Sequence, residues 1–119
     1  MDDSILTSIK SNLGIEEECE DFDKDIVMHI NTAFSILTQL GVGPDKGYRI
    51  KDESNLWSEY LQDELRLELV KDYVYLRVKL IFDPPTSSSV LEAYNKTVSE
   101  LEWRISVTVD PGTTSEEVG

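Results

Sequence analysis

The sequence predicts an all-α fold: a small helical bundle of about four to five helices with an extended C-terminal tail. Three observations predict this class. Apolar residues recur at intervals of three and four along most of the chain, glycine and proline separate these segments, and strand-like alternation is confined to the C-terminal part. A chain of 119 residues is long enough for one domain with its own core. We expect a helical domain over residues 1–106 and an extended or disordered tail over residues 107–119.

The first half of the chain contains two predicted helices of unequal length. Residues 4–13 have apolar side chains on one helical face, and Gly14 follows as a stop signal. Residues 22–40 carry one apolar stripe over about five turns, and Gly41-Val42-Gly43-Pro44 ends it. Between these stripes, residues 16–25 hold seven acidic side chains and one lysine. The second helix therefore begins inside an acidic run, which suits the positive end of its dipole.

The second half contains a loop and three further predicted helices. Residues 41–55 lack periodicity, and loops of this length are often functional. A short helix follows at about 56–63. Residues 65–82 are apolar on two sides, which is typical of the central helix of a bundle. Asp83-Pro84-Pro85 ends that helix, and the last one runs from about 90 to 105. Residues 106–109 then alternate in polarity, which favours an extended segment.

The chain is strongly acidic, with 24 acidic and 11 basic residues and a net charge of −13. Residues 1–64 carry net −10 and residues 65–119 carry net −3. This balance argues against gripping a nucleic-acid backbone, which needs clustered lysine and arginine. No apolar run approaches the roughly 18 residues of a membrane helix, and the N-terminus lacks the pattern of a secretion signal. We expect no membrane association, and a location in a cytoplasm or in a particle assembled there.

No catalytic, cofactor or metal site is predicted. Cys19 stands among five acidic residues, which disfavour the reactive thiolate. His29 lies ten residues further along in a helix, without a partner for a catalytic dyad. Residues 21–25 imitate the start of a calcium loop, but Ile26 and Thr32 stand where glycine and glutamate are required. We therefore expect that the protein is not an enzyme and needs no cofactor.

Two groups of residues are candidates for protein contacts. Basic side chains on the most apolar helix either extend past the core to solvent or pair with an acidic surface of a neighbouring copy, and both interpretations stay open. Trp57, Tyr60 and Trp103 fall outside the clearest stripes, where they serve either satellite core packing or binding. Residues 107–109 can add a strand to a partner. The predicted interaction residues are Lys71, Arg77, Lys79, Trp57, Trp103, Arg104, Val107, Thr108 and Val109.

Two stretches of the chain resemble a known family. The first is residues 25–44, DIVMHINTAFSILTQLGVGP. The second is residues 73–86, YVYLRVKLIFDPPT, followed by a serine-capped helix that ends in Glu100-Leu-Glu-Trp-Arg104. Together they resemble the head–tail connector (portal adaptor) proteins of long-tailed bacteriophages and their prophages. The resemblance covers about residues 3–106, and the helix–Asp-Pro-Pro-Thr–helix junction is its most specific part.

The resemblance implies a structural virion protein at the head–tail interface. Proteins of this kind form a ring, usually twelve-fold, beneath the portal protein. The ring extends the channel through which DNA passes without specific binding, and it gives head-completion stopper or tail proteins a docking surface. Their C-terminal part tends to order against the portal. Two alternatives from the sequence alone are an acidic DNA-mimic inhibitor and a helical adaptor subunit of a cellular complex.

Overall fold

The computed structural model describes residues 4–44, 46–61 and 64–109, and of Glu64, Thr108 and Val109 it describes the backbone alone. Within these ranges the predicted all-α fold is confirmed. Five helices follow in order: α1 (Ile5–Asn12), α2 (Asp23–Gln39), α3 (Trp57–Tyr60), α4 (Glu64–Phe82) and α5 (Ser88–Val109). The described residues form no strand beyond an isolated antiparallel bridge between Ser4 and Leu56.

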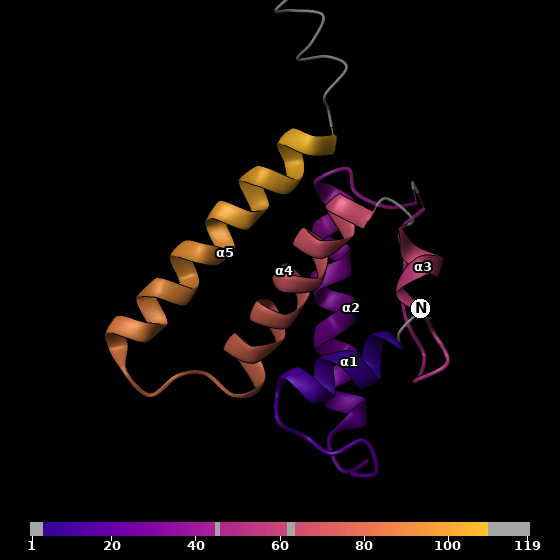
Figure 1. Ribbon diagram of the computed structural model, residues 1–119, viewed down its shortest axis with the longest axis vertical. Helices are drawn as coiled ribbons and strands as arrows, with labels where there is room; N and C mark the ends of the chain where they lie inside the picture. The colour runs from indigo at the N-terminus through magenta and orange to yellow at the C-terminus, as the bar shows by residue number, and fades with distance from the viewer. Residues whose placement is uncertain (1–3, 45, 62–63, 110–119) are drawn as a thin grey trace, which may run out of the picture.

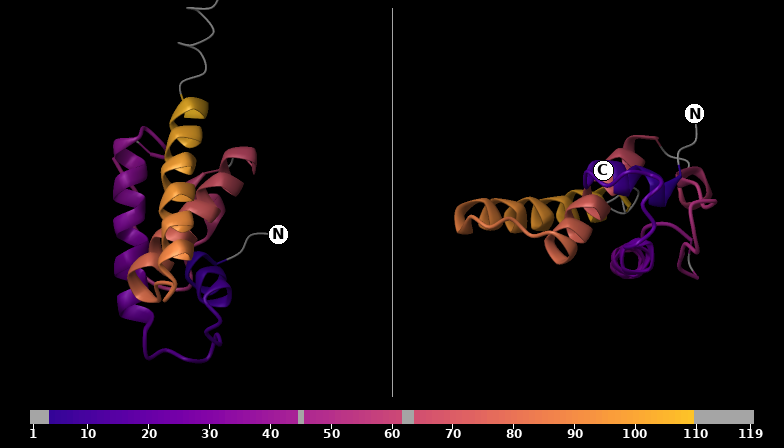
Figure 2. Two further views of the ribbon diagram at one scale, coloured as in Figure 1. Left: turned by 90° about the vertical axis from the view of Figure 1, so that its left-hand side faces the viewer. Right: turned by 90° about the horizontal axis from the view of Figure 1, so that it is seen from below.

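Helix α4 is the centre of the bundle, as its two apolar sides predict. It packs against α2 on one side and against α5 on the other, while α1 packs against α2 (Figure 1). Helices α4 and α5 run antiparallel and draw apart toward the loop that joins them (Figures 1 and 2). The buried residues of α5, Val98, Leu101 and Ile105, all lie from its midpoint onward. Its first half therefore projects from the bundle.

The helix boundaries follow from local signals in the sequence. Ser4 caps α1, since its Oγ accepts a hydrogen bond of 3.2 Å from the backbone N–H of Thr7. Gly41 ends α2 with a φ of 89°, a left-handed conformation that glycine adopts without strain. The N–H of Val42 then donates to the carbonyl of Leu37 at 2.9 Å, which satisfies one of the last free carbonyls of the helix.

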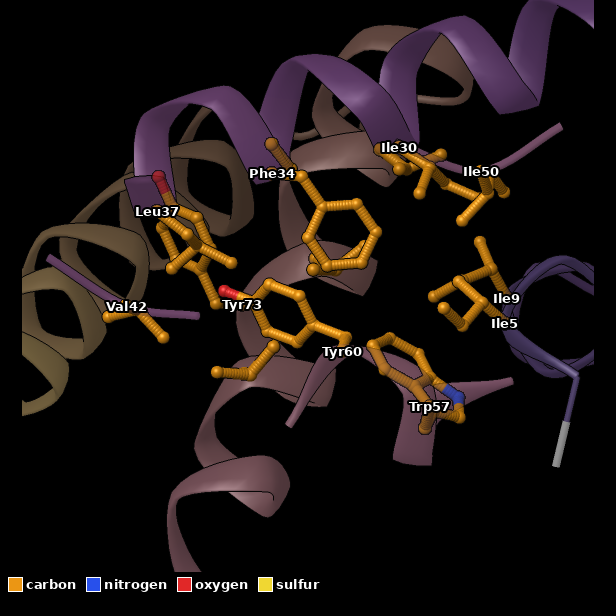
Figure 3. Packing of buried hydrophobic residues seen from close by; sticks show 14 of the residues in the cluster. Ile5, Ile9, Ile30, Phe34, Leu37, Val42, Ile50, Trp57, Tyr60 and Tyr73 are labelled. Atoms are coloured by element: carbon orange, nitrogen blue, oxygen red, sulfur yellow. The ribbon is translucent and has the colours of Figure 1, made fainter. Parts of the chain in front are cut away.

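The core forms around Phe34 of α2, which is fully buried (Figure 3). Its ring centroid lies 4.6 Å from that of Tyr60 and 6.2 Å from that of Trp57. Tyr73 of α4 and Ile5 of α1 are also fully buried in this cluster. Helices α1, α2, α3 and α4 thus share one continuous core, and the short α3 supplies two of its largest side chains.

The segment over residues 41–55, expected to be an irregular loop, is held against α2. Asn31 of α2 is 6% exposed and bonds twice to Ile50: its Nδ2 donates to the carbonyl at 3.1 Å, and its Oδ1 accepts from the N–H at 2.8 Å. Val42 and Ile50 are buried in the core. This segment is therefore an integral part of the fold, anchored at Val42 and Ile50.

One expectation for the C-terminal part is wrong. Residues 107–109 were expected to be extended or disordered, but α5 continues to Val109. The physical reason is that helix growth is cooperative, and the helical penalty of β-branched residues is only a few tenths of a kcal/mol, about 0.7 at most. The next helix-breaking signal in the sequence is Asp110-Pro111. The rest of the predicted tail, residues 110–119, lies outside the described residues.

Candidate protein-interaction surfaces

The outer face of α5 exposes two large apolar side chains near the end of the helix. Trp103 is 67% exposed and Val107, one turn later, is 43% exposed. Arg104 lies beside them and pairs with Glu100, its Nη2 3.7 Å from the carboxylate Oε1. The structure thus brings three predicted interaction residues, Trp103, Arg104 and Val107, onto one helical segment. We call Trp103 and Val107 the α5 ridge.

The inner face of the same segment is firmly attached to α4. Leu101 and Ile105 are buried, and the hydroxyl of Tyr73 donates a 2.7 Å hydrogen bond to Oε2 of Glu102. Burial and the adjacent Glu102 carboxylate raise the pKa of Tyr73, so its phenol stays protonated as the donor. The α5 ridge is therefore presented on a helix whose opposite face is fixed.

The three basic residues predicted as one cluster on α4 do not share a face. A helix turns by about 100° per residue, so Arg77 lies about 120° around the axis from Lys71. Lys71 lies 3.8 Å from a Glu68 oxygen and 5.8 Å from the centroid of the Trp57 ring. Lys79 lies 3.3 Å from a carboxylate oxygen of Asp83 and donates to its carbonyl at 3.1 Å. Both lysines thus have acidic neighbours in their own chain.

Arg77 differs from the two lysines. It stands on the face of α4 that also carries Tyr73, Val74 and Val78, all fully buried. Its Nε is buried without a hydrogen-bond partner, and no ion pair joins it to any of the residues that the structure describes. Arg77 is consequently the unpaired member of the predicted basic set.

Trp57, another predicted interaction residue, belongs to the core. It is 2% exposed, and its indole Nε1 donates a 2.9 Å hydrogen bond to Oγ of Ser8. Tyr60 is similarly buried, at 3%. Of the three aromatic residues that fall outside the stripes, Trp103 alone is exposed. Thr108 and Val109 lie in the last turn of α5, and their side chains are outside the described part of the chain.

The acidic segment between α1 and α2 is organised by a buried lysine. Lys10 is 3% exposed, and its Nζ donates to the carbonyls of Glu17 at 3.0 Å and Cys19 at 2.7 Å. The same Nζ lies 2.9 Å from Oδ1 of Asp23 at the start of α2. The side chains of Glu16, Glu17, Glu18, Glu20 and Asp21 are all exposed. We call these five residues the acidic loop.

Sequence reasoning missed the roles of Lys10 and Asn31, although each left a signal. Lys10 follows Leu6 by four residues, so it stands on the apolar side of α1 just before an acidic run. Asn31 stands next to Ile30 and three residues before Phe34 on the stripe of α2. A polar residue on an inward face indicates a buried hydrogen-bonding group, but its partners depend on the tertiary fold.

The described residues hold no group of three or more histidine, cysteine, aspartate or glutamate side chains placed to bind a metal ion. In the same ranges, no helix combines the length and the apolar character needed to cross a bilayer.

Comparison with known protein families identifies the family of this acidic helical bundle. The family model of the phage connector protein matches residues 5–112, so the chain belongs to the phage connector family and has a role as a phage connector. The match includes all five helices. Neither the curated proteins nor the solved structures gave a match.

Proposed function

We propose that this phage connector is a head–tail adaptor: a structural, non-enzymatic protein that forms a ring between the portal and the stopper or tail proteins and extends the DNA channel. It acts in the virion after assembly in the host cytoplasm. The α5 ridge is the observation that carries this proposal. It lies at the end of the last helix, next to the C-terminal residues, and we assign it to contact with the portal.

The exposure of Trp103 supports a protein contact at this position. A tryptophan side chain buries about 150–250 Å² when fully covered, and two-thirds of Trp103 is open. Covering it would contribute about 3 kcal/mol at about 25 cal/mol per Å². Tryptophan and arginine are also the residues most often found where a few contacts dominate binding, and Arg104 lies beside Trp103.

The charge of the chain supports a channel component that does not hold DNA. Duplex DNA carries about one negative charge per 1.7 Å, and proteins bind its backbone by neutralising phosphates with basic residues. A subunit of net charge −13 repels that backbone instead. DNA can then pass such a ring without being retained.

Mixing with the cognate portal tests the proposal. The full chain should co-sediment with portal rings, and Trp103→Ala should weaken the complex at least tenfold. Truncation after residue 106 should also weaken it, since Val107 of the ridge and the C-terminal residues are lost while Trp103 remains. Lys96→Ala is the matched control, because Lys96 is an exposed residue of α5 outside the ridge. Failure of the full chain to bind, or equal effects of Trp103→Ala and Lys96→Ala, would contradict the proposal.

A further inference from the structure

Arg77 occupies an unusual position for a charged residue. Three of its neighbours on α4, Tyr73, Val74 and Val78, are fully buried, and its own Nε is buried without a partner. The residue as a whole keeps intermediate exposure, so atoms other than Nε reach the surface. One turn further along the same face, Ile81 is 49% exposed. An arginine head and an apolar side chain thus lie together at the edge of the core.

A buried guanidinium N–H without an acceptor is costly, and a carboxylate is its best partner. Charge-assisted hydrogen bonds are about twice as strong as neutral ones, and the planar guanidinium donates two parallel hydrogen bonds to a carboxylate. Lys71 and Lys79 already have acidic neighbours within the chain, but Arg77 has none among the described residues. Because Nε has no exposed surface, an acidic group from outside the chain would meet the part of the Arg77 head that reaches the surface.

The acidic loop of the same protein has the complementary property. Its five carboxylates are exposed, and none forms an ion pair or side-chain hydrogen bond within the described structure. Lys10 holds the backbone of the loop at the Glu17 and Cys19 carbonyls, while the five acidic side chains stay exposed. A loop fixed in this way loses little conformational entropy on binding.

We infer that Arg77 receives a carboxylate from the acidic loop of a second copy of this chain, with Ile81 packing beside it. The two surfaces are different patches of one molecule, so the contact is heterologous and joins copies head to tail. This inference rests on the oligomeric part of the proposed function and names the surfaces that meet. It also assigns a purpose to Lys10, which keeps the acidic loop in the shape that docks.

A charge-swap experiment tests the contact. Arg77→Glu and the double variant Glu18→Lys/Glu20→Lys should each reduce self-association at least tenfold in sedimentation velocity. An equimolar mixture of the two should recover it, because each new surface then faces its opposite charge on the other variant. Lys96→Glu makes the same change of charge as Arg77→Glu at an exposed site of α5 and should leave association unchanged.

Three results would overturn the inference. The first is no recovery in the mixture, and the second is an equal loss of association in Lys96→Glu. The third is a wild-type chain that is monomeric in solution and occupies the portal only as isolated copies. If the free chain stays monomeric, the same comparison is made by counting copies bound per portal ring. Portal binding without recovery in the mixture rejects the inference and leaves the proposed function standing. Recovery in the mixture without portal binding rejects the proposed function and leaves the inference about the contact between copies standing.

Disulfide trapping keeps the test decisive if Arg77→Glu does not fold. A cysteine introduced at Ile81 in the otherwise unchanged chain should form intermolecular disulfides under oxidation with Cys19, the one native cysteine, which lies within the acidic loop segment. The product should be a ladder of linked chains in a denaturing gel. A cysteine at Lys96 should give no ladder. Equal ladders from both positions, or none from either, would reject the contact.

Discussion

Replacement of Lys10 by methionine tests how the acidic segment is held. Methionine keeps an unbranched apolar stem of similar length, so the change removes mainly the ammonium group. That group lies 2.7 Å and 3.0 Å from two backbone carbonyls and 2.9 Å from Oδ1 of Asp23. Its loss leaves the carbonyls of Glu17 and Cys19 without their donor and the Asp23 carboxylate without its counter-ion.

The size of the effect follows from burial and geometry. A hydrogen bond to a charged group contributes about 1.5–3 kcal/mol, and breaking a fully buried ion pair costs about 3–5 kcal/mol. The Lys10 side chain is 4% exposed, but that of Asp23 is 24% exposed, so water replaces part of what Asp23 loses. Methionine also removes the cost of burying the Lys10 ammonium, which offsets part of the loss of stability. We therefore expect the free energy of unfolding to fall by about 2–4 kcal/mol.

Urea denaturation followed by circular dichroism measures this change. The melting temperature should fall with it by about 10 °C for a domain of this size. Lys24→Met is the matched control, because Lys24 is exposed on the first turn of α2 and should change stability by less than about 0.5 kcal/mol. A loss below about 1 kcal/mol for Lys10→Met would refute the reasoning that this lysine organises the segment.

Three further predictions concern the loop over residues 41–55. Gly43→Ala should lower the free energy of unfolding by about 2–4 kcal/mol in urea titrations, because φ of Gly43 is +83° and the new Cβ would lie 2.5 Å from Cε1 of Tyr60. Asn31→Ala should cost about 2–4 kcal/mol in the same assay, since it leaves the N–H and carbonyl of Ile50 buried without partners. Burial and the hydrogen bond to Glu59 raise the pKa of Tyr48 to about 12. Glu59→Gln should lower that pKa toward 10 in an ultraviolet titration, although burial remains. Because the folded state favours the neutral phenol, the contribution of Tyr48 to stability should be present below about pH 10 and be lost as the pH rises to about 12.

Matched controls separate these effects from general disturbance. Gly14 has a φ of +81° but no atom within 4 Å of an added Cβ, so Gly14→Ala should cost only the backbone strain of about 1–2 kcal/mol. Equal losses at Gly14 and Gly43 would contradict the steric part of the argument. Asn12→Ala, at an exposed position, should be close to neutral. An unchanged Tyr48 titration in Glu59→Gln would contradict the contribution of Glu59 to the raised pKa of Tyr48.

The helices were predictable because their signals are local. The stripe of α2 and the stop at Gly41 determine an element and its end within a few residues, and the two apolar sides of α4 correctly predicted its central place. The last turn of α5 was not predictable from its alternation. There Val107 follows an established helix whose inner face is already fixed by Leu101 and Ile105, and continuing that helix outweighs the β preference of a few residues.

The interaction surfaces were only partly predictable, since exposure depends on which elements meet. Trp57 and Trp103 look alike in the sequence, as both fall outside a stripe. The structure buries the first between α1 and α2 and leaves the second on the surface. Similarly, proximity in sequence suggested one cluster of basic residues on α4, but the helical turn separates Arg77 from Lys71. Spacing predicts the face of a residue, whereas its partners require the fold.

The most direct test of the account is an electron cryo-microscopy map of the cognate portal incubated with this chain. The account predicts a closed ring of copies coaxial with the portal, with the α5 ridge against the portal and each Arg77 facing the acidic loop of the next copy. A map in which the chain is absent from the portal would contradict the proposed function. Isolated copies, or a ring with Trp103 facing solvent, would contradict the assigned surfaces.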